Sequence, residues 1–297
     1  MDNPKFSIVG CGRVGVTLAR ILKEKGYPLL GVSSKTRESV DNAANLLGAD
    51  LASLAPGDVT READLVFITT PDDVIEPVCR EIADDQGFKE GSIVLHCSGS
   101  QPSTILSAAG RCKAVIGSIH PLQSIAAITL DSNPFDGIIA AVEGEPRAVE
   151  IGKQISGDIG STCIEIKTQA KSLYHASAVV ASNYLVTLID AACKLMACSG
   201  VDPKSGYQVL KPLLKGSFDN IDRMGIPDAL TGPIARGDHN VVKTHLEEIE
   251  AQAPELLAFY KTLGDYTIDI SLAKKGITAE AAREFREMLA PAPSDRS

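Results

Sequence analysis

The chain has 297 residues, of which 44% are hydrophobic, so it is long enough to bury a large core and to form two domains. Its 29 basic and 38 acidic residues give a net charge of −9, which argues against a nucleic-acid or membrane partner. The seven cysteines form no Cys-x-x-Cys pair and no His/Cys cluster at zinc spacing. We therefore expect no structural metal, and a protein of the reducing cytoplasm.

The first predicted element is a short apolar strand over 5–10 that runs into a glycine-rich turn and then a helix over 13–25. The turn follows the pattern Gly-x-Gly-x-x-Gly and reads Gly10, Cys11, Gly12, Arg13, Val14, Gly15. The first glycine permits the tight bend, the second lets backbone approach a pyrophosphate, and the third lets the helix pack closely on the strand. The helix also directs its unsatisfied N–H groups and positive dipole end toward phosphates. This pattern predicts a dinucleotide site, with a purely structural turn as the alternative.

The second predicted strand, over 28–33, indicates which dinucleotide binds. An NAD site usually ends this strand with an Asp or Glu that binds the ribose 2′-hydroxyl. Here the first carboxylate is Glu38, and it follows hydroxyls and cations, which suit a 2′-phosphate. We therefore expect NADP, with its phosphate bound by Ser33, Ser34, Lys35 and Arg37. The alternative is a solvated loop whose Ser and Thr residues cap a helix.

Short apolar runs then alternate with helical patterns as far as Ile166, which is typical of parallel βαβ units. Further strands are predicted near 64–69, 92–96, 115–119, 138–142 and 161–166. The fold class is therefore α/β, with a Rossmann-like, doubly wound, mostly parallel sheet in a nucleotide-binding domain over 1–166.

Ligands of such sheets bind beyond the carboxyl ends of the strands. Three of the predicted strands end in polar or turn-forming residues, which we expect to line the path toward the nicotinamide. They are Thr69, Thr70, Pro71, Ser98, Gly99, His120 and Pro121. Helix capping is the alternative role for any single serine or threonine among them.

From Lys167 onward, long helical patterns replace the strands. Helices are predicted over 168–198, 203–223, 239–251, 254–274 and 278–289, in an all-helical domain over 167–290 with a flexible tail over 291–297. The segment 176–198 is apolar enough to raise the question of a membrane span. Asn183, Asp190 and Lys194 argue against one, so we expect a helix buried between domains or subunits.

The predicted long helix carries the first candidates for chemistry. Lys171 and His175 lie on one stripe of the helix, and Asn183 borders it. Hydride transfer to C=O or C=N needs a group that supplies a proton or stabilises negative charge, and Lys171 or His175 could do either. In the alternative, Lys171 extends toward solvent at the helix start and His175 is a hydrogen-bonded interdomain histidine.

A second candidate is Arg236, in a Gly- and Pro-punctuated turn. Its planar guanidinium could bind a substrate carboxylate or phosphate bidentately. Alternatively, Arg236 contacts Asp238 and only shapes the loop.

The chain resembles Rossmann-like reductases with an all-helical C-terminal domain. These include pyrroline-5-carboxylate reductase, 3-hydroxyisobutyrate dehydrogenase, ketopantoate reductase and the deazaflavin-dependent NADP reductases, and the nearest match is a subgroup with a C-terminal domain of unknown function. The resemblance rests on four segments, namely 96–99, 117–123, 171–183 and 231–238. It implies that Lys171 is the catalytic lysine that opens the long helix, and that the protein is a homodimer formed through the helical domain. The asparagine expected one turn later is replaced by His175, and an asparagine follows only at Asn183.

These observations together predict an NADPH-dependent oxidoreductase that reduces a small carbonyl or imine in the interdomain cleft. Lys171 is the expected proton donor, His175 and Asn183 position the substrate, and Arg236 anchors an anionic group. Two alternatives stay open. One is a non-catalytic NADP(H)-binding sensor or scaffold, and the other is hydride exchange between NADP and a deazaflavin.

Overall fold

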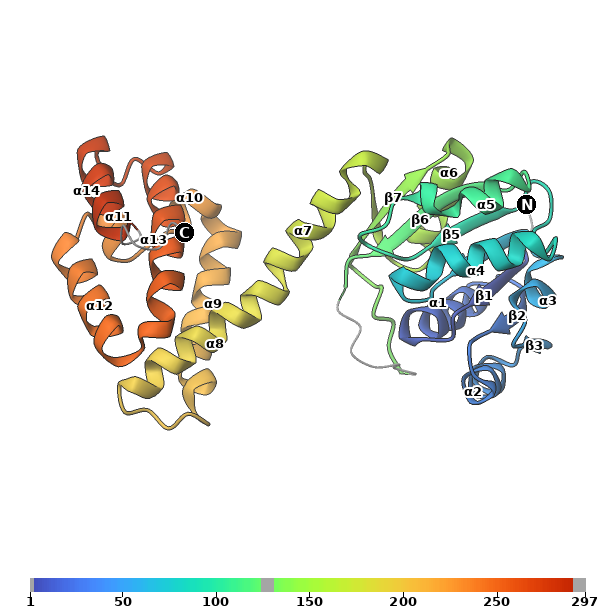
Figure 1. Ribbon diagram of the computed structural model, residues 1–297, viewed down its shortest axis with the longest axis horizontal. Helices are drawn as coiled ribbons and strands as arrows, with labels where there is room; N and C mark the ends of the chain where they lie inside the picture. Colours follow the sequence, from blue (N-terminus) through green and yellow to red (C-terminus); the bar gives the residue numbers. More distant parts are fainter. Residues whose placement is uncertain (1–2, 124–130, 291–297) are drawn as a thin grey trace. The chain divides into compact units, whose positions relative to one another are not determined.

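The computed structural model describes residues 3–123 and 131–290 (Figure 1). By its internal contacts the chain divides into two compact units, Met1–Ala181 and Ser182–Ser297. The first unit holds the sheet, and the second is built from helices. The predicted flexible tail over 291–297 lies outside the described residues.

The sheet of the first unit has eight strands in the order β3-β2-β1-β4-β5-β6-β7-β8. The strands are β1 (Phe6–Val9), β2 (Leu29–Ser33), β3 (Leu51–Ser53), β4 (Leu65–Ile68), β5 (Ile93–His96), β6 (Val115–Pro121), β7 (Ile139–Gly144) and β8 (Thr162–Glu165). All neighbours pair in parallel except β6 and β7, which are antiparallel. The predicted Rossmann-like, mostly parallel sheet is confirmed.

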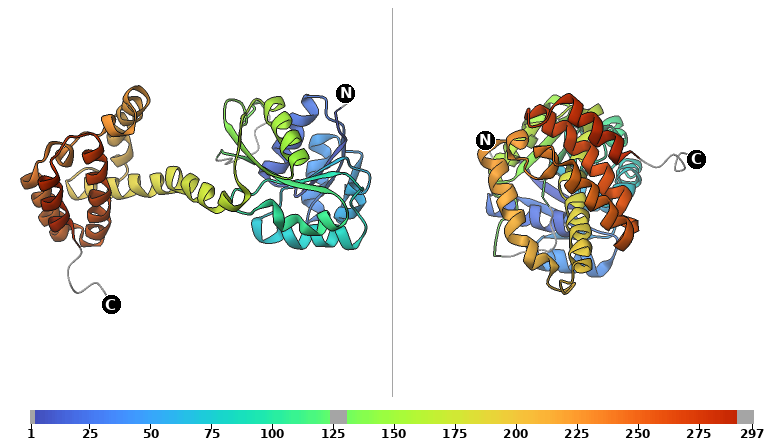
Figure 2. Two further views of the ribbon diagram at one scale, coloured as in Figure 1. Left: turned by 90° about the horizontal axis from the view of Figure 1, so that it is seen from above. Right: turned by 90° about the vertical axis from the view of Figure 1, so that its left-hand side faces the viewer.

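Helices cover both faces of this sheet, as the view from above shows (Figure 2). They are α1 (Arg13–Glu24), α2 (Arg37–Leu47), α3 (Pro56–Thr60), α4 (Asp72–Asp84), α5 (Ser107–Arg111) and α6 (Pro146–Asp158). Alternate residues of each strand point to opposite faces. Phe6 and Ile8 of β1 therefore pack with α1, α2 and α6, whereas Val9 packs with α3, α4 and α5.

The sequence order of the strands reverses between β1 and β4, which lie side by side with β2 and β3 on one side and β5 and β6 on the other. Because β1, β4, β5 and β6 are parallel, the loops after them emerge at one edge. Doubly wound sheets bind ligands at such a reversal. The segments 10–12, 69–71 and 97–99 are thereby brought to the ligand-binding edge.

All seven predicted strands are present, and the sequence missed only β3. That strand has three residues at the edge of the sheet, and Leu51 is exposed rather than buried. Its strand geometry depends on pairing with Gly31, Val32 and Ser33 of β2. Three residues are too few for a local pattern to reveal a strand.

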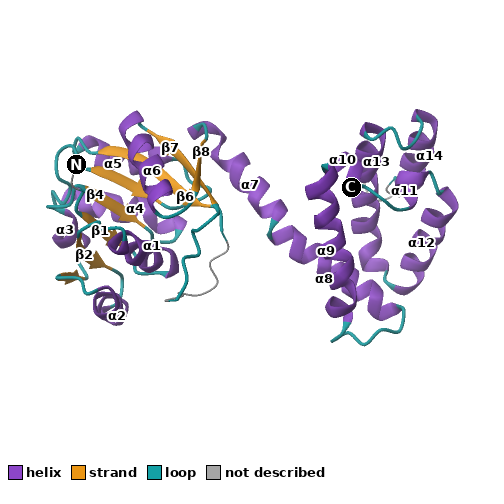
Figure 3. Ribbon diagram, turned by 180° about the vertical axis from the view of Figure 1, so that it is seen from behind, coloured by secondary structure: helices purple, strands orange, loops and turns teal. Residues whose placement is uncertain are grey.

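Every regular element in the described part of the second unit is a helix (Figure 3). The α-helices are α8 (Asn183–Cys198), α9 (Gly206–Met224), α10 (Ile226–Ala229), α11 (Pro233–Arg236), α12 (His239–Gln252), α13 (Leu257–Ala273) and α14 (Ala279–Leu289). Ile234, Val242, Ile268, Phe285 and Leu289 form its core. This unit corresponds to the predicted all-helical region, with α10 and α11 as additional short helices.

The predicted helix over 168–198 is divided in the structure. A short 3-10 turn, η2 (Thr168–Ala170), leads into α7 (Lys171–Ala181), and Ser182 separates α7 from α8. The first unit therefore ends after Ala181, whereas the sequence pattern placed the boundary after Ile166. The reason is physical, because the side chain of Lys171 is buried in the first unit, 1% exposed.

Close packing of α1 on the sheet depends on Gly15. A Cβ at this position would overlap the carbonyl oxygen of Gly10 and Oγ1 of Thr69, whereas a Cβ on Gly12 would meet nothing within 4 Å. We expect Gly15→Ala to lower the free energy of unfolding by about 1–3 kcal/mol, as overpacking does. Gly12→Ala should change it little. Urea denaturation of the two variants checks this, and equal losses would contradict it.

Candidate functional site

A cavity of about 610 Å³ lies at the edge where the strand order reverses. The ends of β1, β2 and β4 and the segments that follow them supply most of its lining. The lining residues are Val9, Gly10, Cys11, Gly12, Ser33, Ser34, Lys35, Ser39, Leu54, Pro56, Thr69, Thr70, Pro71, Val74, Val78 and Glu81. Nine of the predicted cofactor residues therefore share one cavity, although they come from three separate segments.

The glycine turn is tightly packed at its start and open in its middle. Gly10 has φ of +108°, and a Cβ there would lie 2.7 Å from backbone atoms of Thr69 and Thr70. Thr69 fixes the turn by donating from Oγ1 to the Gly10 carbonyl oxygen at 2.6 Å. Gly12 precedes α1 and has no neighbour that would contact a Cβ. The helix N-terminus thus adjoins an unobstructed stretch of backbone, which is the arrangement that an anionic phosphate needs.

Cys11 lies between these glycines, and its Sγ donates to the carbonyl oxygen of Ser33 at 3.4 Å. Its backbone N–H donates to Ser34 Oγ, also at 3.4 Å. Burial raises the pKa of the Cys11 thiol to about 11, so the side chain is a neutral thiol at physiological pH. The contacts of Cys11 tie the turn to the end of β2.

The end of β2 supplies hydroxyls and one cation to the cavity. Ser33, Ser34 and Lys35 line it as predicted, together with Ser39 from the first turn of α2. Arg37 is not among the lining residues. It lies 3.7 Å from Asp41, one helical turn away, with 63% of its side chain exposed. Lys35 is therefore the cation that the structure assigns to this cavity.

A second group of polar side chains gathers where β5 and β6 end. His120 of β6 pairs through Nδ1 with the hydroxyl of Tyr174 at 3.0 Å, and its ring lies 6.5 Å from that of His175. Gly99 lies between the two histidines. A Cβ there would be 2.8 Å from His120 Nε2 and 2.7 Å from His175 Cδ2. The loop after β5, the end of β6 and helix α7 thus converge on one point.

Two histidines of this region, His120 and His96, are held in the neutral form. Burial, followed by the charge of Lys171, lowers the pKa of His120 to about 4. The same two causes lower the pKa of His96, at the end of β5, to about 4. His96 accepts through Nδ1 from the backbone N–H of Ser98 at 3.1 Å, which shapes the loop that carries Gly99. Neutral imidazoles can both donate and accept a proton, so the group suits proton transfer.

Lys171 is buried beside Glu143 of β7. Its Nζ donates to Ser118 Oγ in a short contact and to Glu143 Oε1 at 3.2 Å, and both charged side chains are 1% exposed. Glu143 also accepts from Ser118 Oγ at 2.6 Å, from Thr168 Oγ1 at 2.8 Å, and from the backbone N–H and Oγ of Ser103 in the 3-10 turn η1 (Ser103–Leu106). We call these five residues the Glu143 network.

Opposing effects set the charges within the Glu143 network. Burial lowers the pKa of the Lys171 ammonium, and the negative charge of Glu143 offsets only part of this effect. Burial also acts to raise the pKa of Glu143, but hydrogen bonds from Ser118 and Ser103 and the charge of Lys171 bring it below its usual value. The carboxylate is therefore ionised and fully paired. These contacts anchor Lys171 at the start of α7. Its expected role as the proton donor stays a prediction.

The remaining predicted residues of the first unit lie in a loop, at the end of a strand or at the start of a helix, next to the cavity or the histidines. Ser98 Oγ accepts from the backbone N–H groups of Ser100 and Gln101, which is the capping alternative considered for it. Pro121 is buried as the last residue of β6. Arg13, Val14 and Gly15 open helix α1 directly after the cavity lining.

Asn183 and Arg236 belong to the second unit. Asn183 opens α8, and Arg236 ends α11, where its Nη2 lies 2.9 Å from Asp238 Oδ2. The Arg236–Asp238 contact is thus the loop-shaping alternative considered for this arginine.

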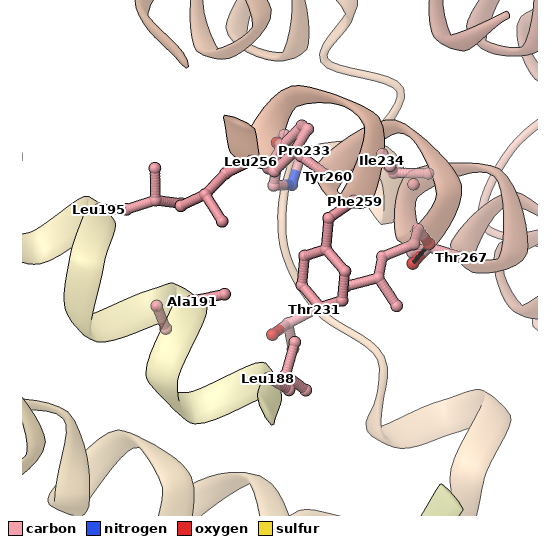
Figure 4. Close-up of a pocket in the computed structure, with 13 residues that line it drawn as sticks. Leu188, Ala191, Leu195, Thr231, Pro233, Ile234, Leu256, Phe259, Tyr260 and Thr267 are labelled. Atoms are coloured by element: carbon pink, nitrogen blue, oxygen red, sulfur yellow. Dashed lines mark hydrogen bonds between the residues drawn. The ribbon is translucent and has the colours of Figure 1, made fainter. Parts of the chain in front are cut away.

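The second unit also holds an apolar cavity of about 260 Å³ between α8, the α11 region and α13, where Leu188, Phe259 and Thr267 are labelled (Figure 4). No charged lysine, arginine or carboxylate lines that cavity, so it lacks the groups that a dinucleotide requires.

Sequence reasoning missed several residues of these sites, among them Glu143, Tyr174 and Ser39. Glu143 carried a signal, because it is a lone acid at the end of the apolar run Ile138–Val142. Tyr174 follows Lys171 by three residues, but nothing in the sequence indicates that its hydroxyl meets His120. No cluster of His, Cys, Asp or Glu side chains able to hold a metal ion occurs within residues 3–123 and 131–290.

Comparisons with protein families divide the chain earlier than its internal contacts do, because the second match begins next to β7, within the first unit. Residues 3–121 match the model of a Rossmann-like domain, and residues 138–267 match a domain of unknown function, DUF2520. The chain joins a Rossmann-like domain to a DUF2520 domain. The resemblance identified from the sequence is therefore confirmed. No curated protein sequence matches the chain.

Solved structures match over nearly the whole chain. A Thermotoga maritima protein is 26% identical with a TM-score of 0.71, and the match covers 95% of this chain and 98% of that one. A Bacteroides fragilis protein assigned as an NADP oxidoreductase is 20% identical with a TM-score of 0.69, covering 96% and 99%. An imine reductase variant from Myxococcus stipitatus, in complex with NAD⁺, is 17% identical with a TM-score of 0.60, covering 95% and 99%. The latter two likenesses show the fold alone.

The Glu143 network leads to a stability prediction. Removing one member of a buried ion pair leaves the other charge unpaired, so Lys171→Met should lower the free energy of unfolding by about 3–5 kcal/mol. Lys153 and Glu165 form a matched surface pair in the same unit, at 2.7 Å and about half exposed. Lys153→Met should change stability little, because exposed pairs are weak. Urea titrations measure both, and a mild Lys171→Met effect would show that the buried pair does not hold α7.

Proposed function

We propose that the protein is an NADP-dependent oxidoreductase that transfers hydride from NADPH to a small carbonyl or imine substrate. The observation that carries this proposal is the cavity in which the open glycine turn, the hydroxyls of Ser33 and Ser34 and the ammonium of Lys35 meet. The turn would hold the pyrophosphate at the N-terminus of α1. The hydroxyls and Lys35 would bind a 2′-phosphate, because charge-assisted hydrogen bonds offset its desolvation.

The chemistry of the proposal comes from the neighbouring strand ends. A nicotinamide extending along the edge from β1 past β4 would approach Gly99, His120 and His175. The neutral imidazole of His120 can give a proton to the heteroatom that hydride transfer leaves negatively charged. The structural neighbours assigned as an NADP oxidoreductase and an imine reductase support this reaction class through their shared fold. The placement of the substrate between the two domains, with Asn183 and Arg236 in contact, stays a prediction.

The proposed activity is tested by mixing the protein and NADPH with a panel of small aldehydes, ketones, 2-oxo acids and cyclic imines. Loss of the reduced-nicotinamide absorbance with at least one compound class is expected, and calorimetry measures NADPH binding separately. Tight NADPH binding with no turnover on any compound would overturn the reductase and favour a sensor or scaffold. Turnover restricted to a deazaflavin would favour hydride exchange.

The proposed preference for NADP depends on Lys35. Loss of a charge-assisted hydrogen bond costs about 1.5–3 kcal/mol, so Lys35→Ala should weaken NADPH binding by about 10- to 100-fold. Binding of NADH, which lacks the 2′-phosphate, should change little. Arg37→Ala is the matched control, because Arg37 pairs with Asp41 and does not line the cavity. Equal losses for the two dinucleotides in Lys35→Ala would reject the phosphate pocket.

We also propose that the protein is a homodimer formed through its helical unit. Large apolar side chains are exposed on α8 and α9, including Val186 and Leu213, each 68% exposed. The helical run 168–198 is long and apolar enough, by length and composition alone, to cross a membrane, and 6% of its apolar stretch is buried. Within that run, Asp190 and Lys194 form an ion pair at 2.8 Å, which favours a protein partner over lipid.

The dimer is tested by sedimentation at several protein concentrations. Val186→Asp combined with Leu213→Asp should convert the dimer into a monomer, because each charge would be buried in the interface. Leu46→Asp, on the exposed side of α2 in the first unit, is the control and should leave the dimer intact. A wild-type protein that sediments as a monomer at all concentrations would reject the proposal.

A further inference from the structure

We propose that His120 is the proton donor of this site and that Tyr174 fixes the tautomer of His120 and replaces its proton. This inference rests on the proposed reductase function and narrows its substrate class to carbonyl compounds. Tyr174 acts through His120, so it is a positioning residue with a role in proton relay.

The proton between the two side chains belongs to the tyrosine. The Tyr174 oxygen and His120 Nδ1 lie 3.0 Å apart, and the two rings are nearly perpendicular at 86°. Burial raises the pKa of Tyr174 to about 12, while the pKa of His120 is about 4. At neutral pH the phenol is therefore protonated and the imidazole is uncharged. Tyr174 donates to Nδ1, which leaves the single proton of the imidazole on Nε2.

The other end of the imidazole points to the place where a substrate would react. His120 Nε2 lies 2.8 Å from the position that a Cβ on Gly99 would occupy. Gly99 follows β5, whose neighbour β4 leads into the cavity lining at Thr69. The absence of a side chain at Gly99 keeps the Nε2–H from being blocked by this loop. A donor is thus held at the edge along which the nicotinamide is proposed to extend.

The proton transfers balance for a carbonyl substrate. The C–H bond of NADPH breaks, its electron pair forms a new bond to the carbonyl carbon, and the C=O π pair moves to oxygen. The oxygen takes the proton from His120 Nε2, and His120 Nδ1 takes the proton from Tyr174. The tyrosinate then recovers its proton from His120 Nδ1 while Nε2 takes a proton from water, which restores the Nε2–H tautomer. NADP⁺, an alcohol and hydroxide are released. An alkoxide is a stronger base than tyrosinate, so the transfers run in this direction.

The titratable groups that act on the pKa of His120 are Lys171 and His175 of α7 and Asp72 of α4. The positive charge of Lys171 disfavours an imidazolium at His120, whereas Asp72 has the opposite, smaller effect. An imine substrate reacts as an iminium, which already carries its proton and needs no donor. A relay that begins from neutral groups therefore suits a carbonyl substrate.

The tautomer is measured first, without any substrate. Nitrogen NMR of the full-length protein with ¹⁵N-labelled histidine should show His120, assigned by its loss in His120→Gln, as the Nε2–H tautomer at neutral pH. Tyr174→Phe should abolish this preference. Tyr260→Phe is the matched control, because it removes a second Tyr–His contact, to His245 Nδ1 at 2.8 Å, in the other unit. An Nδ1–H tautomer in the wild type would overturn the relay whether or not the protein is a reductase.

Kinetics with NADPH then test the relay in turnover, with glyoxylate, propionaldehyde and 1-pyrroline as probes. Wild-type kcat for a carbonyl probe should be nearly constant from about pH 6 to 9, because both groups keep their charge states. In Tyr174→Phe only an imidazolium can donate, so kcat should fall about tenfold per pH unit above the His120 pKa. If kcat of the wild type and of Tyr174→Phe depended on pH in the same way, Tyr174 would serve only in packing, and the proposal would be overturned. Wild-type turnover of 1-pyrroline alone would overturn the carbonyl assignment, and no turnover of any probe would count against the proposed function instead.

Discussion

The burial of Lys171 beside Glu143 is the constraint on which the rest of the site depends. Two charges removed from water are costly unless each is paired and hydrogen-bonded. Here Glu143 accepts from Lys171, Ser118, Ser103 and Thr168, which come from three separate segments. Only one placement of the first turn of α7 satisfies all of them. That placement brings Tyr174 and His175, on the next turn, to His120.

The parallel sheet supplies the other half of the site. Because β1, β4, β5 and β6 run in the same direction, the glycine turn, Thr69, Gly99 and the end of β6 emerge at one edge. The groups that suit a dinucleotide and the groups that suit proton transfer are thereby neighbours, although about a hundred residues separate Gly10 from His120 in the sequence. Strand direction, rather than any single contact, makes hydride and proton transfer at adjacent positions feasible.

Much of this arrangement could be predicted from the sequence, where the cause is local. The strands follow from apolar runs, and the turn at Gly10 follows from a backbone with positive φ that glycine adopts readily. Glycine spacing, the polar residues after β2 and the polar end of β4 likewise placed nine residues of the cavity. Lys171 and His175 were recognised as important from their stripe on one helix. Periodicity shows which residues share a face, but not what that face meets.

The parts that escaped prediction depend on contacts between distant segments. The pairing of Lys171 with Glu143 joins α7 to β7, and no local pattern records it. Arg37 and Lys35 looked equivalent in the sequence, and only the turn of α2 directs Arg37 toward Asp41. Tyr174 meets His120 because the contact of Lys171 with Glu143 fixes the start of α7. Sequence patterns identified the residues that carry chemistry better than they identified the role of each one.

The reversal of β7 decides where the chain leaves the first unit. Since β7 is antiparallel to β6 and β8 is parallel to β7, the chain finishes β8 heading away from the ligand-binding edge. Helix α7 must therefore run back past Ser118 toward His120 before the second unit begins. The connecting helix is consequently also a wall of the site. A recombination event at the end of β8 would therefore replace Tyr174 and His175, whereas one after Ala181 would keep both reactive side chains with the sheet.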